Sequence, residues 1–116
     1  MKVYQYPKCS TCRKALKWLD GRKIAYDKTD LVATPPSLTA LRDLFRRSGL
    51  PIARLFNTSG ESYRAGNFKQ RLGTMSEAEA LAALAKDGKL IKRPIVDTGK
   101  VVLVGFDEAA YGKTLG

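Results

Sequence analysis

The chain has 116 residues, 44% of them hydrophobic, a size that predicts one compact domain whose core needs no disulfide or structural metal. It contains no histidine, so it supplies no imidazole general base, no hydrolase triad and no histidine-ligated metal. The net charge of +10 favours an anionic partner, but Lys and Arg are spread over every segment without a nucleic-acid-binding motif, so no direct contact with nucleic acid is expected.

A strand, a helix and a second strand are predicted at the start of the chain. Residues 2–6 alternate like a strand, and Pro7 ends it. A helix follows and ends near Gly21, and residues 24–31 form the second strand. One helix between two strands predicts a right-handed βαβ unit with parallel strands. The apolar stripe of the helix consists of Cys12, Ala15, Leu16 and Leu19.

The middle of the chain is predicted to be helical. Ser37 suits the N-cap of a helix that stops at Gly49, and short helical turns interrupted by NTSGE follow it. Ser76 and Glu79 form the capping box of a further helix, which Gly88 terminates. The core-facing positions of the two longer helices are predicted to be Leu41, Leu44, Phe45, Leu81, Ala82, Leu84 and Ala85.

The end of the chain returns to strands. Residues 94–106 contain two β-branched runs separated by the turn DTGK, which predicts an antiparallel hairpin, and residues 107–113 form a short final helix. The order βαβ, helices, then hairpin and helix is that of an α/β thioredoxin-like (glutaredoxin-like) fold. We therefore expect a single domain over residues 1–116 with a helical insertion at about 35–88.

The two cysteines, Cys9 and Cys12, form a Cys-x-x-Cys pair where the first helix begins. In a reducing cytosol such a pair favours a redox or metal function over a structural bridge. Without histidine, two cysteines cannot complete a zinc shell within one chain, so no metal is expected. Both could instead be packing residues, but Cys9 lies between Lys8 and Ser10 at a loop-to-helix junction, a poor place to bury a thiol. A redox pair is the favoured interpretation.

The helix assigns the two thiols different roles. Cys9 precedes the first turn, where free N–H groups and the positive end of the dipole favour a thiolate, and Lys8, Arg13 and Lys14 add positive charge. Cys12 begins the apolar stripe and should be buried and protonated. Cys9 is therefore predicted to be the nucleophile and Cys12 the resolving thiol.

Several other residues are candidates for binding a substrate. Ser10 and Thr11 could simply cap the helix, or their hydroxyls and amides could hold an anionic group at Cys9, with Arg13 nearby. Arg93 directly precedes Pro94, which opens the first strand of the hairpin. From these residues alone, a plain strand start with a solvated arginine is equally consistent.

Four segments together resemble the arsenate reductase and Spx/MgsR family in their order and spacing: YPKCSTCRKALKWL at 6–19, FNTSGESYR at 56–64, MSEAEAL at 75–81 and DGKLIKRPIV…VGFDE at 87–108. The similarity runs over essentially the whole chain. It implies a thioredoxin-like fold with an inserted helical region, a reactive Cys9, and a cis Arg93–Pro94 peptide that faces it.

The resemblance also implies which activities to consider. Glutaredoxin-coupled arsenate reductases share Cys9 and Arg93 but carry further arginines, which align with Asn57 and Gly105. Spx-type regulators share the Cys-x-x-Cys, whose disulfide controls binding to the α-subunit of RNA polymerase. An arsenate reductase and a redox-switched regulator are therefore the alternatives to a general thiol–disulfide oxidoreductase.

In the leading interpretation, Cys9 attacks a small thiol adduct, an oxyanion or a protein disulfide, and Cys12 or glutathione resolves the product. No bound cofactor is expected, and glutathione, glutaredoxin or thioredoxin would be the reductant. The N-terminus has no apolar signal region, and the longest apolar run, residues 80–85, is too short to span a bilayer. A cytoplasmic protein without a membrane partner is expected.

Overall fold

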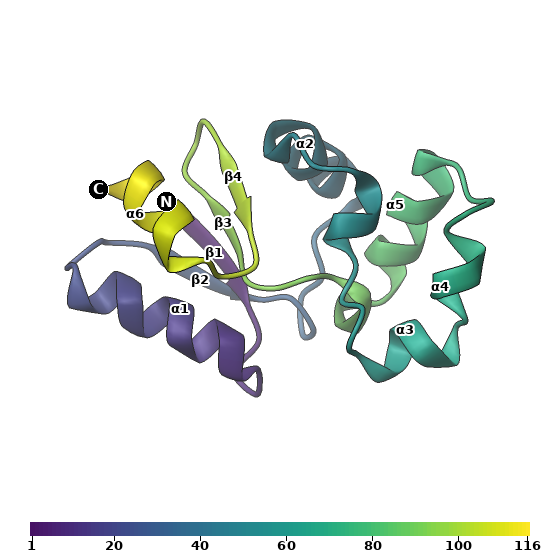
Figure 1. Cartoon of the computed structure of the whole chain (residues 1–116), viewed down its shortest axis with the longest axis horizontal. Helices are drawn as coiled ribbons and strands as arrows, with labels where there is room; N and C mark the ends of the chain where they lie inside the picture. Colours follow the sequence, from purple (N-terminus) through teal and green to yellow (C-terminus); the bar gives the residue numbers. More distant parts are fainter.

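A four-stranded sheet lies at the centre of the computed structural model, which describes residues 1–116 (Figure 1). The strands are β1 (Lys2–Gln5), β2 (Asp27–Asp30), β3 (Ile95–Asp97) and β4 (Val102–Val104). Their order in the sheet is β2-β1-β3-β4. β1 pairs in parallel with β2, whereas β3 is antiparallel to both β1 and β4. The predicted βαβ unit and C-terminal hairpin are confirmed.

Helices cover both faces of the sheet. Side chains alternate along each strand, so each face presents apolar residues that pack against a layer of helices. Val3 and Val96 point to one face, where they pack with Tyr111 and with residues of the first helix. Tyr4 and Ile95 point to the opposite face, against the helical insertion. Figure 1 shows the first and last helices on one side of the strands and the insertion on the other. The helices on the first face are α1 (Ser10–Gly21) and α6 (Glu108–Leu115).

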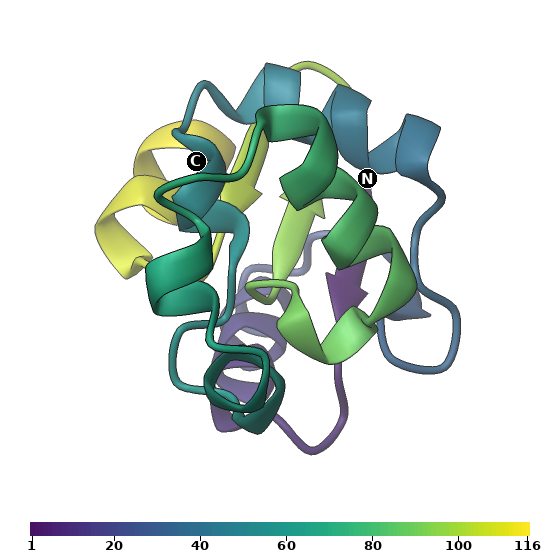
Figure 2. The same cartoon turned by 90° about the vertical axis from the view of Figure 1, so that its right-hand side faces the viewer.

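The segment between β2 and β3 is helical, as predicted, and Figure 2 looks onto it with the sheet behind. The predicted N-cap is present, because the Ser37 hydroxyl accepts the Ala40 N–H at 3.1 Å. The capping box is present too, with Ser76 and Glu79 bonded in both directions. The elements of this segment are α2 (Leu38–Ser48), η1 (Ile52–Leu55), α3 (Glu61–Ala65), α4 (Phe68–Arg71), α5 (Glu77–Lys86) and η2 (Gly88–Leu90).

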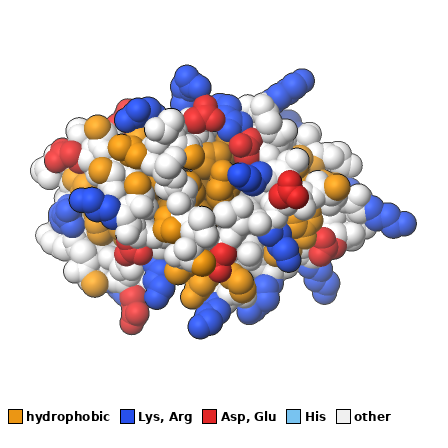
Figure 3. All heavy atoms as spheres, turned by 180° about the vertical axis from the view of Figure 1, so that it is seen from behind, with side chains coloured by type: hydrophobic (Ala, Val, Ile, Leu, Met, Phe, Trp, Pro, Cys, Tyr) orange, Lys and Arg blue, Asp and Glu red, His pale blue; other side chains and the backbone are white.

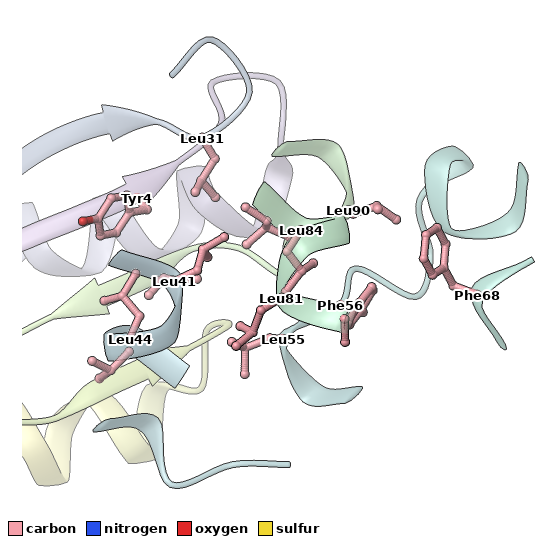
Figure 4. Packing of buried hydrophobic residues seen from close by; sticks show 14 residues of the cluster. Tyr4, Leu31, Leu41, Leu44, Leu55, Phe56, Phe68, Leu81, Leu84 and Leu90 are labelled. Carbon is pink, nitrogen blue, oxygen red and sulfur yellow. The ribbon is translucent and has the colours of Figure 1, made fainter. Parts of the chain in front are cut away.

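The core of the insertion differs from the prediction in both longer helices, and in α2 the predicted Phe45 is only partly buried. Leucines from α2 and α5 and Tyr4 of β1 form one buried cluster (Figure 4). In α5 the buried residues are Ala80, Leu81 and Leu84, whereas the predicted Ala82 and Ala85 are only partly buried. The run ALAALA has no polar residue to mark the edge of its apolar face, so the pattern could not locate that face to within one position.

The second strand is shorter than predicted. It begins at Asp27, whereas residues 24–31 were expected to be extended throughout. Ile24 and Tyr26 instead pack against the cluster under α1, which removes them from the sheet. Leu31 is fully buried beyond the end of the strand, in the cluster that includes the insertion.

The surface matches the scattered charge of the sequence. On the face drawn in Figure 3, Lys and Arg lie around the whole outline, with Asp and Glu between them. None of the helices combines the length and the apolar character that a membrane span requires.

One ion pair ties the insertion to the sheet. Arg47 of α2 donates to both carboxylate oxygens of Asp97 in β3, at 2.7 and 2.9 Å, and the two side chains are only 22% and 19% exposed. The Arg47 guanidinium is the main cause that lowers the pKa of Asp97 below its ordinary value of 3.8. A two-bond pair of this kind between elements far apart in sequence should stabilise the fold.

We expect Arg47→Met to lower the free energy of unfolding by about 1 to 2 kcal/mol, because it leaves Asp97 without its partner. Since folding lowers the pKa of Asp97, the contribution of the pair is present above pH 3.8 and is lost as the pH falls below it. Urea unfolding at pH 7 and pH 3 measures both effects. Arg46→Met is the matched control, because Arg46 is 78% exposed and bonds only to Asp43. Equal losses in the two variants would contradict the prediction.

Candidate active site

Cys9 lies at the N-cap of α1, with extended backbone angles and a half-exposed side chain. Its Sγ accepts the N–H of Cys12 at 3.4 Å, so the sulfur takes the place of a capping oxygen. Its own N–H donates to the carbonyl of Tyr6 at 3.0 Å, which holds the turn after β1. The free amides of the first helical turn therefore face the sulfur, where a negative charge is favoured.

The surroundings move the pKa values of the two thiols in opposite directions. Burial, the largest influence on Cys9, raises its pKa, but hydrogen bonds from Cys12 and the nearby Arg93 guanidinium outweigh it and lower the pKa below 9.0. Burial raises the pKa of Cys12 to about 12, and the neighbouring Cys9 adds to the rise. The cation that acts on Cys9 is thus Arg93, from the far end of the chain.

Arg93 reaches Cys9 from the segment that leads into β3. The Arg93–Pro94 peptide bond is cis, as the resemblance implies. The guanidinium lies over the ring of Tyr6 at 5.1 Å and donates to the carbonyl of Lys89 at 3.3 Å. Its Nε is buried and has no hydrogen-bond partner. Arg93 is therefore held in the site and is not a freely solvated side chain.

A third segment, the NTSG turn at 57–60, lies beside the same site. Phe56 and Ile91 form an isolated antiparallel bridge. On either side of it, the Asn57 N–H donates to the carbonyl of Leu90 and the Lys92 N–H to that of Leu55, both at 2.7 Å. This bridge fixes the turn next to residues 92–93.

The three segments enclose a cavity of about 290 Å³ at Cys9. Its wall is almost entirely polar, contains two cations, and includes no Asp or Glu. Such a cavity suits a small anionic group placed against the sulfur. The lining residues are Cys9, Ser10, Thr11, Asn57, Ser59, Gly60, Lys92 and Arg93.

The structure brings most of the predicted site residues together. Cys9, Ser10, Thr11 and Arg93 line the cavity, while Cys12 and Pro94 are buried behind it. Arg13 lies outside, because its guanidinium turns back to donate to the carbonyl of Pro7 at 3.2 Å.

Sequence reasoning did not include the remaining wall of the cavity. Asn57 is expected only as a position that lacks an arginine. Ser59, Gly60 and Lys92 lie in the segments at 56–64 and 87–108 that carry the resemblance, but no binding role is predicted for them. The signals available were these two segments and, within the first, the polar and glycine-containing turn NTSG. No group of three or more His, Cys, Asp or Glu side chains is arranged to hold a metal ion.

Fold and site together define a thioredoxin-fold protein that presents a cysteine at a helix N-terminus, beside an arginine that precedes a cis-proline. The chain belongs to the ArsC family, whose model matches residues 4–114. A Bacteroides fragilis protein of known crystal structure has a TM-score of 0.94 to it at 44% identity, covering 97% of this chain and 94% of that one. The predicted family and the thioredoxin-like fold with its insertion are confirmed.

The relatives include both reductases and regulators. Protein YusI of Bacillus subtilis is 49% identical over 93% of this chain and 92% of its own. An arsenate reductase of Neisseria meningitidis serogroup B is 31% identical over 90% and 89%. The global transcriptional regulator Spx of Listeria monocytogenes is 26% identical over 91% and 79%. The family is thus shown, and it contains proteins of more than one function.

Proposed function

We propose that the protein is a thiol–disulfide oxidoreductase in which Cys9 is the nucleophile and Cys12 or glutathione is the resolving thiol. The observation that carries this proposal is the contrast between the two sulfurs. Cys9 lines an open polar cavity and has a lowered pKa, whereas Cys12 is fully buried with a raised pKa. A thiolate is the reactive form, so only Cys9 is prepared to attack.

In the first step, the Cys9 thiolate attacks one sulfur of a substrate disulfide. A bond forms between the two sulfurs, the original S–S bond breaks, and the second half of the substrate leaves as a thiolate that takes a proton from water. The Cys12 N–H and Arg93 stabilise the attacking charge. The product is a mixed disulfide on Cys9.

In the second step, the mixed disulfide is resolved by another thiol. If Cys12 does so, it loses its proton and attacks the Cys9 sulfur, the remaining substrate thiolate leaves, and a Cys9–Cys12 disulfide forms. The Cys9 charge is one cause of the raised Cys12 pKa, so consuming that charge makes Cys12 easier to deprotonate. Two electrons from glutathione, glutaredoxin or thioredoxin then restore both thiols. No bound cofactor takes part.

The test is to trap the mixed disulfide with the Cys12→Ser variant. We expect this variant to hold a thiol adduct on Cys9 when it is treated with oxidised glutathione or cell lysate, because the internal resolving thiol is missing. Intact-mass and peptide mass spectrometry identify the adduct and its position. Cys9→Ser is the control and should hold no adduct. An adduct on Cys12 in that control, or none on Cys9 in the first variant, would refute the assignment.

Arsenate reduction is the second candidate, because the cavity is cationic and contains no acidic residue. Robust turnover with glutathione and glutaredoxin that is lost in Cys9→Ser would place it first. Of the two positions that align with family arginines, only Asn57 lines the cavity. Gly105 has a φ of 81°, so an arginine placed there would be strained.

A pull-down from cell lysate with the unmodified protein, oxidised in one sample and reduced in the other, separates an enzyme from a regulator. The chain has no membrane-spanning helix. We propose that it acts in the cytoplasm, a reducing compartment in which Cys9 stays a free thiol. Capture of the RNA polymerase α-subunit by only the oxidised or only the reduced protein would favour a role like that of Spx. Reduction of glutathione mixed disulfides without such capture would favour the oxidoreductase.

A further inference from the structure

We propose that Lys92 determines the specificity of the Cys9 cavity by binding a negatively charged group, a carboxylate or a tetrahedral oxyanion, next to the sulfur under attack. This inference rests on the proposed role of Cys9 as nucleophile and adds a residue that selects among its substrates. It makes Lys92 a binding residue of the cavity, with no part in activating the thiol.

The backbone fixes the position of Lys92 at the cavity. Its N–H donates to the carbonyl of Leu55 at 2.7 Å, directly beside the Phe56–Ile91 bridge. Ile91 is fully buried, so the segment is anchored in the core immediately before Lys92. The side chain of Lys92 therefore starts from a fixed point and lines the cavity together with Arg93.

The Lys92 side chain occupies the space beside Gly105, which has no side chain of its own. A Cβ atom at Gly105 would lie only 3.4 Å from Cε of Lys92, so the lysine passes over the bare glycine backbone. Two hydrogen bonds of 2.8 Å hold the glycine there. Its N–H donates to the carbonyl of Pro94, and its carbonyl accepts from the hydroxyl of the buried Tyr111. Its φ of 81° is one that a residue with a side chain rarely adopts.

Lys92 is the cation of the cavity that remains available to a ligand. Arg93 already interacts with the Cys9 sulfur, with the ring of Tyr6 and with a backbone carbonyl. Lys92 forms no ion pair, since the ion pairs of the protein join Arg46 and Arg47 to Asp43 and Asp97. With no carboxylate in the wall, a bound anion meets uncompensated positive charge.

The test compares two alkylating agents that differ by one charge. Iodoacetate carries a carboxylate and iodoacetamide is its neutral counterpart, and both react with the Cys9 thiolate. We expect Lys92→Met to lower the ratio of the iodoacetate rate to the iodoacetamide rate about fivefold, the size of an exposed charge pair. The ratio is the readout, because any change that Lys92→Met makes to the Cys9 thiolate alters both rates alike and cancels in it. Lys92→Arg should restore the ratio.

Lys89→Met is the matched control, because Lys89 is an exposed lysine of the same segment that does not line the cavity. Its ratio should equal that of the unmodified protein. Inorganic phosphate and succinate, added as protecting anions, distinguish the tetrahedral oxyanion from the carboxylate. Whichever protects Cys9 should protect it less in Lys92→Met.

Three results would overturn the inference. They are an unchanged rate ratio in a folded Lys92→Met variant, an equal drop in Lys89→Met, and anion protection that does not depend on Lys92. Failure of Cys9 to react with iodoacetamide in the unmodified protein has a different meaning. It would overturn the proposed function itself, and the inference with it.

Discussion

Cys9 is expected to react with iodoacetamide about 100-fold faster than Cys12 at pH 7, measured in the variants Cys12→Ser and Cys9→Ser. In the unmodified protein, a thiol with a pKa of about 12 has about one thiolate in 10⁵ molecules at this pH. The Cys9→Ser variant removes the contribution of Cys9 to that rise but keeps burial, which is its largest cause. Cys9, with its pKa below 9.0, has more than about one in 100. The higher intrinsic reactivity of the more basic thiolate offsets about one power of ten of this difference. Burial of Cys12 then slows it further.

The pH dependence checks the cause of the difference. The rate of Cys9 should rise with pH along a titration curve whose midpoint lies below pH 9.0, because its pKa is lowered in the fold. Arg93→Met should shift this profile to higher pH, since a cation that favours the thiolate is lost. Rates that are equal in the two serine variants, or a profile that ignores Arg93, would contradict the assignment of nucleophile and resolving thiol.

Gly88→Ala is expected to destabilise the protein by about 3 kcal/mol, the upper range for a forced overlap in a packed interior. A Cβ atom at this position would lie 2.1 Å from the carbonyl oxygen of Leu31 and 2.8 Å from its carbonyl carbon. Both atoms are backbone, so no side chain can rotate away to make room. The segment at η2 would have to move away from the end of β2. Thermal or urea unfolding measures the resulting loss in the free energy of unfolding.

Gly21→Ala is the matched control for this prediction. It lies at the end of α1, and a Cβ there has nothing within 4 Å. Because alanine favours a helix over glycine, the variant should be as stable as the unmodified protein or more so, by up to about 1 kcal/mol. A Gly88→Ala variant that unfolds at the same urea concentration as Gly21→Ala would show that the contact is not tight.

Sequence reasoning was most successful where the signal is local. The capping residues, the Cys-x-x-Cys at the start of α1, and the hairpin turn are each decided by residues within a few positions of one another. Gly88 is an instructive exception. It was predicted from its position after a helix, but the structure shows that it is required because the backbone of Leu31 approaches it. Glycine is common both after the end of a helix and where another backbone segment comes close, so the sequence does not distinguish the two reasons.

From the sequence alone, a small α/β domain with Cys9 at the start of its first helix could be predicted, because cysteine spacing and helix position are local properties. What surrounds that sulfur depends on the folded chain. Asn57 and Lys92 reach the cavity through the pairing of Phe56 with Ile91, 35 positions apart, and Arg13 leaves it for the carbonyl of Pro7. Long-range backbone pairing and the packing of a glycine against a lysine have no periodic signature, which is why the polar wall of the cavity could be located only in the folded chain.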